Sequence, residues 1–410
     1  MTETTPQTAT EVAIAQTERA AASNYAPVPL VLTEGDGATV TDIEGTTYLD
    51  FLGGFSTMLF GHRPPRITAA AHAQLDRLTL TARAFYNDEL AACVTELTEL
   101  AGFERVLLMN TGAEAIETAL KCARKWAHET RDLAADEGVV ITFSRNFHGR
   151  TTTIISGSDD PVAREGYGPY TPGFVTVPFG DMAAVREVAA SSPVVAVLIE
   201  PVQGEAGVIL PPEGFLAELR AFTAENDIVF IADEVQSGMG RTGKLFATEH
   251  FGVRPDLIAV GKVLSGGILP VSAVLGDSKF LGVFTPGSHG STFGGSPFAC
   301  AVTRSVVAEL RDPDFLPGVV ALGAVLSAAL AELSELPEVT AVRSIGLWAG
   351  VDIDPEFAPA KAVAEALRDR GVLVKDTQSK TLRMAPPAVA TEAEIRGAIR
   401  LLGDAIVSLR

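Results

Sequence analysis

Short apolar runs alternate with helix-length segments between about residues 103 and 275. The runs are apolar at nearly every position, which is typical of parallel strands covered on both faces rather than of half-exposed antiparallel strands. Strands of this kind alternating with helices predict an α/β domain. The predicted strands are Val106–Met109, Val139–Phe143, Val194–Ile199, Ile228–Ala232, Leu257–Val260 and Val271–Leu275.

Amphipathic segments between these runs predict the helices that cover the sheet. Apolar residues at three- and four-residue spacing favour helices over Ala113–Glu129, which follows the turn Asn-Thr-Gly, and over Gly214–Asn226. After about Ser296 the pattern changes to helical stretches near Ala299–Leu310 and Val319–Leu333, followed by short strand-like runs. This second pattern predicts a smaller α+β domain.

The chain is therefore expected to have three parts. Residues 1–55 form an N-terminal segment, with the hairpin-like stretch VTDIEGTTYLDF, that packs with the small domain. Residues 56–295 form the large α/β domain, and residues 296–410 form the small α+β domain.

Composition and charge narrow the classes of partner. The 410 residues are 47% hydrophobic and can bury a sizeable core, while the net charge of -19 would repel nucleic acid and an anionic membrane, so neither is an expected partner. No apolar run approaches the roughly 20 residues of a membrane span, and no targeting peptide is recognised at the N-terminus. Cys93, Cys122 and Cys300 are widely spaced, which favours a reducing cytoplasm over a disulfide framework or a zinc site.

One lysine differs from the others in its surroundings. Lys262, in Val-Gly-Lys-Val-Leu-Ser-Gly-Gly, follows a buried-type strand and precedes a glycine loop. Open α/β sheets bind ligands at the carboxyl ends of their strands, and burial there lowers the pKa of a lysine, leaving a neutral amine for Schiff-base formation. The alternative is a lysine whose long stem simply reaches the surface.

An acidic residue follows another predicted strand. Ile228–Ala232 runs directly into Asp233, which can simply cap the next element. Asp233 and Lys262 also form the pair that pyridoxal phosphate needs, because the cofactor's aldehyde requires a lysine and its pyridine nitrogen requires an acid that keeps it protonated. The sequence supplies this pair on separate strands.

A phosphate group would need backbone N–H donors at a helix start. Gly112 and Ala113 open the long predicted helix, where glycine allows close approach and the helix dipole favours an anion, although a plain N-cap has the same sequence. Phe147 can stack on a planar cofactor or belong to the core, and His148 is expected to pack or to form a hydrogen bond. The histidines show no metal-ligand spacing, so no metal site is predicted.

Several stretches, in one order along the chain, resemble a known family. The chain is similar to the class III, pyridoxal-phosphate-dependent ω-aminotransferases from about Asn24 to its end. Within that family, NYAPVPLVL, LTLTARAFYND and LRMAPP are most similar to the ornithine aminotransferases, which move the δ-amino group of ornithine to 2-oxoglutarate. The matching stretches are MNTGAEAIETALKCARKWA, NFHGRT, GYGPYTPGF, EPVQGEAGV, FIADEVQSGMGRTGK, GKVLSGGILPVSAV and GSHGSTFGGSPFAC.

The resemblance implies the fold of the aspartate aminotransferases, fold type I. This is an α/β fold with a large, mostly parallel sheet domain that holds the cofactor and a smaller α+β domain. The resemblance also implies a homodimer with shared active sites, or a higher oligomer built from it. A small-molecule amino donor and 2-oxoglutarate would be the substrates.

The resemblance also assigns roles to residues around the cofactor. Lys262 would form the Schiff base and move the proton between substrate carbon and cofactor, and Asp233 would pair with the pyridine nitrogen. The amides of Gly112 and Ala113 would bind the phosphate. Thr292 would reach the phosphate of the neighbouring subunit.

Other positions follow from the same resemblance. Phe147 and Val235 would enclose the cofactor ring, and Gln236 would bond to its hydroxyl oxygen. Tyr25 and Arg150 would hold the α-amino and α-carboxylate end of ornithine, which leaves the distal amine at the cofactor.

The two half-reactions make opposite demands on the second arginine. Arg383 would receive the α-carboxylate of glutamate or 2-oxoglutarate, which is absent when ornithine presents its distal end. Glu205 would mask Arg383 while the basic substrate is bound, and the pair would open when a second carboxylate arrives.

One segment departs from the family pattern. Ornithine aminotransferases usually have YSAVNQGH where this chain has FSTMLFGH, so Phe55 lacks a phenolic hydroxyl and Leu59 and Phe60 replace Asn-Gln. The pocket is expected to be more apolar. A missing hydrogen bond costs about 0.5 to 1.5 kcal/mol, which shifts substrate preference by roughly tenfold; alternatively Phe55 keeps the packing and ornithine remains the substrate.

The expected function is therefore an ornithine:2-oxoglutarate δ-aminotransferase that gives glutamate 5-semialdehyde, which cyclises to pyrroline-5-carboxylate, in two ping-pong half-reactions. One alternative is a related ω-aminotransferase acting on 4-aminobutyrate, 5-aminovalerate, lysine or N-acetylornithine. An alternative of a different class is a non-enzymatic module that binds the cofactor.

Overall fold

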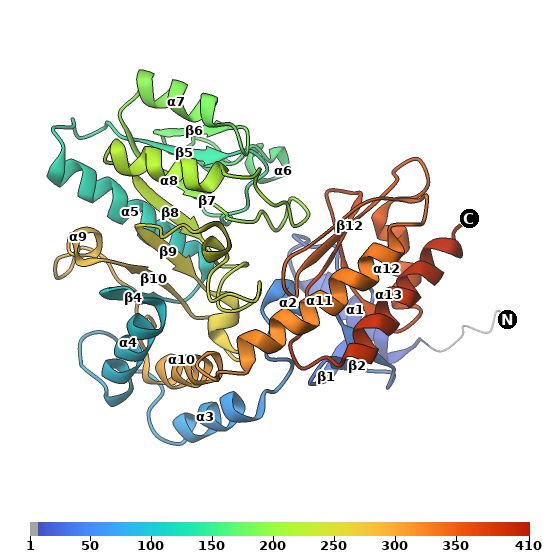
Figure 1. Ribbon diagram of the computed structural model, residues 1–410. Coiled ribbons are helices and arrows are strands. Elements are labelled where there is room, and N and C mark those ends of the chain that lie inside the picture. The colour runs from blue at the N-terminus through green and yellow to red at the C-terminus, as the bar shows by residue number, and fades with distance from the viewer. Residues whose placement is uncertain (1–6) are drawn as a thin grey trace.

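A seven-stranded sheet forms the larger half of the molecule, and the computed structural model describes residues 7–410 (Figure 1). Its strand order is β4-β10-β9-β8-β7-β5-β6. All six predicted strands are confirmed to within one residue at each end. The strands are β4 (Arg105–Met109), β5 (Val139–Phe143), β6 (Phe174–Val177), β7 (Val194–Ile199), β8 (Val229–Asp233), β9 (Leu257–Val260) and β10 (Ser272–Gly276).

Two features of this sheet differ from the prediction. β6 was not predicted, because this edge strand is short and only its last residue is buried. β10 is antiparallel to both β4 and β9, whereas a parallel strand was expected. The segment 261–271 between β9 and β10 is shorter than the roughly dozen residues that a parallel crossover needs, so the chain turns straight back.

Helices cover both faces of the large sheet. Alternate residues of β8 face opposite layers: Val229 and Ile231 belong to the cluster around α5 (Gly112–Thr130), and Phe230 to the cluster that contains α8 (Phe215–Glu225). Burial on both faces explains the continuously apolar strands. The remaining α-helices beside this sheet are α3 (Pro65–Leu75), α4 (Asp88–Ala101), α6 (Pro161–Arg164), α7 (Met182–Ser191), α9 (Ser278–Leu281) and α10 (Pro297–Leu310).

The four predicted helices are present with small differences in length. α5 and α8 match within one residue at each end, whereas α10 begins two residues early and α11 (Phe315–Leu333) four residues early. Both of these helices have a proline in the first turn, where its missing N–H costs nothing.

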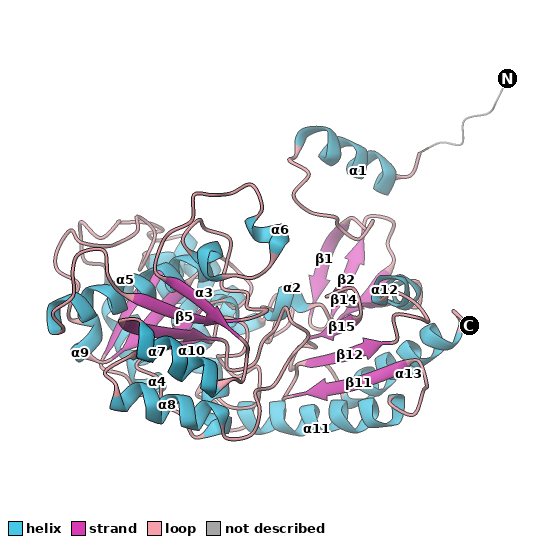
Figure 2. Cartoon of the chain, turned by 90° about the horizontal axis from the view of Figure 1, so that it is seen from above, coloured by secondary structure: helices cyan, strands magenta, loops and turns pink. Residues whose placement is uncertain are grey.

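A separate antiparallel sheet of order β11-β12-β15-β14 forms the smaller half, and α11 runs along β11 (Figure 2). A third sheet joins the N-terminal segment to the C-terminal part, because β3 pairs in parallel with β13. The hairpin-like stretch forms the antiparallel pair β2–β3. The elements are α1 (Ala9–Ala20), β1 (Leu32–Asp36), β2 (Thr39–Asp42), β3 (Thr47–Asp50), α2 (Gly53–Ser56), β11 (Val339–Ser344), β12 (Ala349–Ile353), α12 (Ala360–Arg368), β13 (Val372–Leu373), β14 (Lys375–Thr377), β15 (Thr381–Met384) and α13 (Glu392–Val407).

The predicted boundary at residue 296 leads into α10, which packs against α3 and α4 beside the large sheet. α11 then crosses to the small sheet, where it packs against α13 and β11.

α11 corrects the expectation that no apolar run reaches the length of a membrane span. Its 19 residues have a hydropathy of 1.9, which is apolar enough to cross a membrane by length and composition alone. A core helix of a globular protein passes the same test. The face of α11 that holds Leu326, Leu330 and Leu333 is buried in the hydrophobic core.

Candidate active site

A cavity of about 580 Å³ lies at the carboxyl ends of the large sheet's strands. Asp233 ends β8, Glu200 follows β7, and Lys262 follows β9. Because β7, β8 and β9 are parallel, their ends meet at one edge, where open α/β sheets bind ligands. The structure therefore brings together residues that lie far apart in the sequence. The predicted cofactor-binding residues that line the cavity are Gly112, Ala113, Phe147, Asp233, Val235, Gln236 and Lys262.

Lys262 begins a short 3-10 helix, η3 (Lys262–Ser265), with a left-handed φ of 42°. Burial lowers the pKa of its amine, and the nearby carboxylates of Asp233 and Glu205 partly oppose that shift. A lowered pKa raises the fraction of neutral amine at a given pH. Lys262 lines the cavity, which is the position that the predicted nucleophile requires.

Asp233 is held by two hydrogen bonds on the floor of the cavity. Its Oδ2 lies 2.7 Å from Nδ1 of His148, and its Oδ1 accepts from the Val235 amide at 3.1 Å. His148 is therefore a hydrogen-bonding residue, as expected. Asp233 caps the following turn and also lines the cavity, and its pairing with a pyridine nitrogen stays a prediction.

The start of α5 has the geometry of an anion site. Thr111 caps the helix through its side chain, and Glu114 completes a capping box. A Cβ placed on Gly112 would lie only 2.9 Å from Cγ1 of Val235, so the backbone at this point fits against the cavity wall only as glycine. The first backbone N–H groups of the helix have no partner within it and can bind an anion.

The second predicted arginine site is assembled beside the cavity. Arg383 on β15 is 3% exposed and donates to Glu205 at 2.5 Å and to Gln236 at 3.3 Å. Its guanidinium carbon lies 5.4 Å from the centroid of the Phe55 ring. Glu205, Arg383 and Phe55 therefore form one cluster. This cluster lies next to Gln236, which lines the cavity.

Six predicted residues lie outside the cavity lining: the cluster of Phe55, Glu205 and Arg383 beside it, and Tyr25, Arg150 and Thr292. Arg150 is exposed, although its guanidinium lies 5.5 Å from the ring of Phe147. Tyr25 is 77% exposed, and Thr292 is also exposed. Within one chain the structure does not bring Tyr25 and Thr292 to the cavity.

The FSTMLFGH segment corrects one expectation. Leu59 and Phe60 are buried in the core and do not line the cavity, so their replacement of Asn-Gln leaves its polarity unchanged. Thr57 and Met58 do line it. Phe55 has a left-handed φ of 56°, so the backbone turns sharply and places its ring at Arg383.

Comparison with known proteins agrees with this geometry. A family model described as Aminotransferase class-III matches residues 20–406. The chain belongs to this family. Its members are pyridoxal-phosphate-dependent aminotransferases, and so is this protein.

Several characterised class-III aminotransferases are close relatives. An ornithine aminotransferase from Bordetella pertussis is 48% identical over 376 residues, which cover 91% of this chain and 90% of the relative. The crystal structure of the ornithine aminotransferase from Toxoplasma gondii ME49 superposes with a TM-score of 0.95 at 39% identity, covering 98% of this chain and 96% of that one. An acetylornithine aminotransferase from Elizabethkingia anophelis has a TM-score of 0.89 at 42% identity, covering 97% and 99%.

The aminotransferase cofactor fits the residues present. Lys262 is available for the aldehyde, Asp233 for the pyridine nitrogen, and the start of α5 for the phosphate. The glycine-only backbone at Gly112 leaves room for the group, while Phe147 and Val235 line the same cavity. No group of three or more potential metal ligands occurs in residues 7–410.

Sequence reasoning missed one buried acid of this aminotransferase site. Glu200 is 4% exposed and lines the cavity directly after β7. The signal was present, because Glu200 follows a continuously apolar strand just as Asp233 does.

Proposed function

We propose that this aminotransferase transfers the δ-amino group of L-ornithine to 2-oxoglutarate, giving glutamate 5-semialdehyde and glutamate. The observation that carries the proposal is the pair between Glu205 and Arg383 at 2.5 Å. With the pair closed, the site accepts an amine that has no carboxylate near the cofactor. With the pair open, Arg383 is free to bind the α-carboxylate of a dicarboxylate. The relatives named ornithine aminotransferase support the choice of donor.

Pyridoxal phosphate, when bound, supplies an aldehyde that condenses with amines and a ring that accepts electrons. The residues of this chain would orient the cofactor and transfer the proton. Asp233, fixed by His148 at 2.7 Å, keeps a negative charge where the pyridine nitrogen would lie. The amine of Lys262, with its lowered pKa, would take a proton at Nζ from the substrate carbon and deliver it to the cofactor rather than back to that carbon.

The donor is held at its far end. Arg150 stands at the rim beside Phe147, where a guanidinium can form two parallel hydrogen bonds with the α-carboxylate of ornithine. Tyr25, which is exposed in the single chain, would have to move or be reoriented by a second copy to contact the same end. This arrangement directs the distal amine toward Lys262 and leaves the α-carbon outside.

A homodimer completes the proposed site. Thr292 is exposed on its own chain. In the proposed dimer, its hydroxyl would reach the cofactor phosphate in the site of the second copy. Large aromatic side chains of two neighbouring segments are also exposed: Phe85 at 71%, Tyr86 at 93% and Phe293 at 57%. Such exposure is typical of a surface that a second copy covers.

Three buried free cysteines support a cytoplasmic location, where thiols stay reduced.

A second candidate donor is N-acetylornithine or another ω-amine. The acetylornithine aminotransferase noted above is 42% identical to this chain, and Phe55 lacks a hydroxyl that would favour a charged donor. The aminotransferase family and the buried Lys262 weigh against a module that only binds the cofactor.

A panel of amine donors tests the assignment. Catalytic efficiencies kcat/KM with 2-oxoglutarate are compared for ornithine, 4-aminobutyrate, 5-aminovalerate, lysine and N-acetylornithine. Ornithine is expected to rank first. A clearly higher efficiency with any other donor would make that donor the substrate.

A further inference from the structure

Glu200 is a buried acid beside the cofactor site that the mechanism above does not use. It follows β7, the strand next to β8, lines the cavity and is 4% exposed. A carboxylate this deeply buried needs hydrogen-bond partners to be tolerated.

Each oxygen of Glu200 holds a different loop. Oε2 accepts from the backbone amide of Phe147 at 3.0 Å, and Oε1 accepts from the amide of Gly204 at 3.2 Å. The first loop carries the aromatic wall of the cavity. The second loop carries Glu205, which forms the pair with Arg383. One side chain directly after β7 thus bonds to both loops.

The second loop has little freedom beyond that hydrogen bond. A Cβ on Gly204 would lie 2.7 Å from Oε1 of Gln236 and 2.8 Å from Cζ2 of Trp348. The backbone of Gly204 therefore packs directly against both side chains. The Thr377 hydroxyl also donates to the backbone carbonyl of Glu205, at 2.5 Å. The bond from Gly204 to Glu200 is the contact that ties this loop to the carboxylate shared with the Phe147 loop.

The charge of Glu200 depends on pH near neutrality. Burial raises the pKa of the Glu200 carboxyl to about 7, the interaction with His148 opposes this shift, and the charge of Asp233 adds to it. Lys262, after β9, also faces this carboxyl. Above pH 7 both oxygens are free to accept. Below pH 7 one oxygen carries a proton, so that only the other remains a strong acceptor.

We propose that Glu200 is a positioning residue that holds the Phe147 loop and the Glu205 loop together. Given the function proposed above, it keeps Glu205 in place against Arg383 and thereby sustains the preference for ω-amines over α-amines. This preference weakens when Glu200 is protonated.

The test replaces Glu200 by glutamine in the holoenzyme. The glutamine amide has only one acceptor oxygen, which can accept from one of the two loops. Its NH2 group then faces the backbone N–H of the other loop, and two donors cannot form a hydrogen bond. The readout is the ratio of kcat/KM for ornithine to kcat/KM for L-alanine, measured with 2-oxoglutarate from pH 6 to 8. The wild-type ratio is expected to rise with pH. The Glu200→Gln ratio is expected to be flat and about tenfold lower at pH 8.

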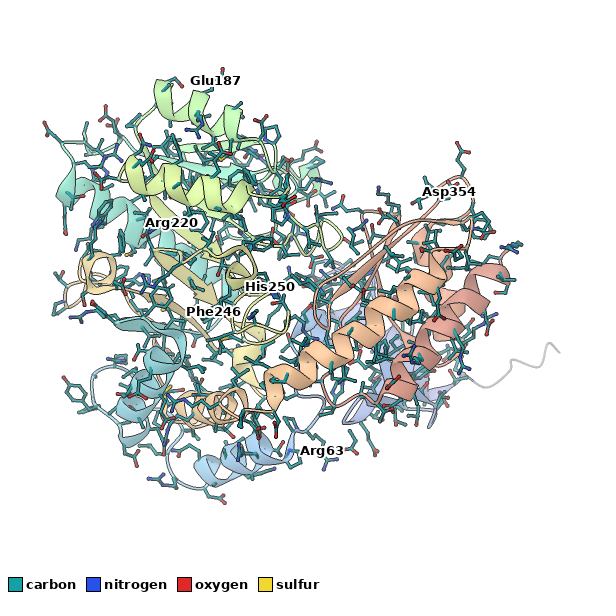
Figure 3. The ribbon with its side chains drawn as sticks, in the orientation of Figure 1. Arg63, Glu187, Arg220, Phe246, His250 and Asp354 are labelled. Carbon is teal, nitrogen blue, oxygen red and sulfur yellow. The ribbon has the colours of Figure 1, made fainter. Side chains whose placement is uncertain are left out.

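Glu234→Gln is the matched control. Glu234 is also a buried carboxylate with a raised pKa, and it accepts from the backbone amides of Ala247 and Thr248. These amides lie between Phe246 and His250, which Figure 3 labels in the segment after β8. Glu234 does not line the cavity. The control is expected to keep the wild-type ratio and its pH dependence; the same change in both variants would overturn the proposal.

A second measurement does not depend on the folding of Glu200→Gln. The chain has two tryptophans, so Trp126→Phe leaves only Trp348, beside Gly204. Its fluorescence, recorded without substrate, is expected to change between pH 6 and 8; a constant emission contradicts the proposal.

If ornithine proves a poor donor, the proposed function fails, and the same ratio measured with the preferred ω-amine still tests Glu200.

Discussion

Under the proposed function, single side chains around Arg383 select which end of a substrate reaches Lys262. Arg383 is almost fully buried, and its charge is met by Glu205 together with the face of the Phe55 ring. A buried guanidinium with a removable carboxylate partner can serve two substrates that differ in the position of their carboxylates. Selectivity is therefore a property of two or three residues and is open to substitution.

Removing the masking carboxylate should redirect the enzyme. In Glu205→Ala, Arg383 stays unmasked, so that α-amino acids bind through their carboxylate during both half-reactions. The ratio of efficiencies for ornithine over L-alanine is expected to fall by about tenfold or more, because charged hydrogen bonds are worth roughly 1.5 to 3 kcal/mol. Steady-state kinetics with both donors measure the ratio, and unchanged selectivity would count against the masking role.

Restoring a phenol at position 55 tests the departure from the family pattern. Phe55→Tyr adds one hydroxyl next to Arg383 and is expected to raise the preference for ornithine over 4-aminobutyrate by up to about tenfold. Phe55→Leu serves as the control for the ring itself, because it removes the aromatic face and adds no polar group. Equal donor preferences in the wild type and Phe55→Tyr would show that the hydroxyl is not needed.

At the level of elements, the start of α5 is the predicted phosphate site. Its first turn carries orphan N–H groups, and Gly112 packs so closely on Val235 that no side chain fits. The helix itself is long, and its inner face is buried in the core around β7, β9 and β10. The site is thus anchored by the same contacts that stabilise the sheet.

Adding one methyl group at the start of α5 should weaken cofactor binding. In Gly112→Ala the new Cβ meets Val235 at 2.9 Å, which shifts the wall of the cavity. The dissociation constant of pyridoxal phosphate, measured by absorbance titration, is expected to rise by about tenfold. Gly397→Ala in α13 is the matched control, because its Cβ meets only the tip of Arg400 at 3.9 Å. The control is expected to leave the constant unchanged and to stabilise the helix slightly.

At the level of the whole molecule, the two halves meet at the site, since Arg383 comes from the small sheet and Gln236 from the large one. In the proposed dimer, the site would also include Thr292 from a second copy of the chain. Thr292 is exposed in one chain, so its proposed role at the phosphate would be filled in the site of a partner copy.

Mixing two defective chains tests this sharing. Lys262→Ala is expected to be inactive, and Thr292→Ala to bind the cofactor weakly. A mixed dimer would contain one intact site, with Lys262 from one chain and Thr292 from the other. Activity of the mixture, after subunit exchange at a low cofactor concentration, is expected to exceed the sum of the separate variants. An activity equal to that sum would place Thr292 outside the shared site.

Local pattern was enough to predict much of this protein. Continuous apolar runs located six strands to within one residue, and polar residues directly after them identified Lys262 and Asp233. These features depend on near neighbours in the chain, because burial on both faces imposes apolar residues at successive positions.

Other features were decided only by the tertiary structure. The antiparallel direction of β10, the burial of Leu59 and Phe60, and the two loops held by Glu200 depend on which segments meet. Phe147 and Glu200 lie 53 positions apart, and the sequence around either residue does not indicate that the two are in contact. Sequence alone therefore determined the elements and the chemical groups at their ends, whereas packing between distant segments decided how those groups face one another.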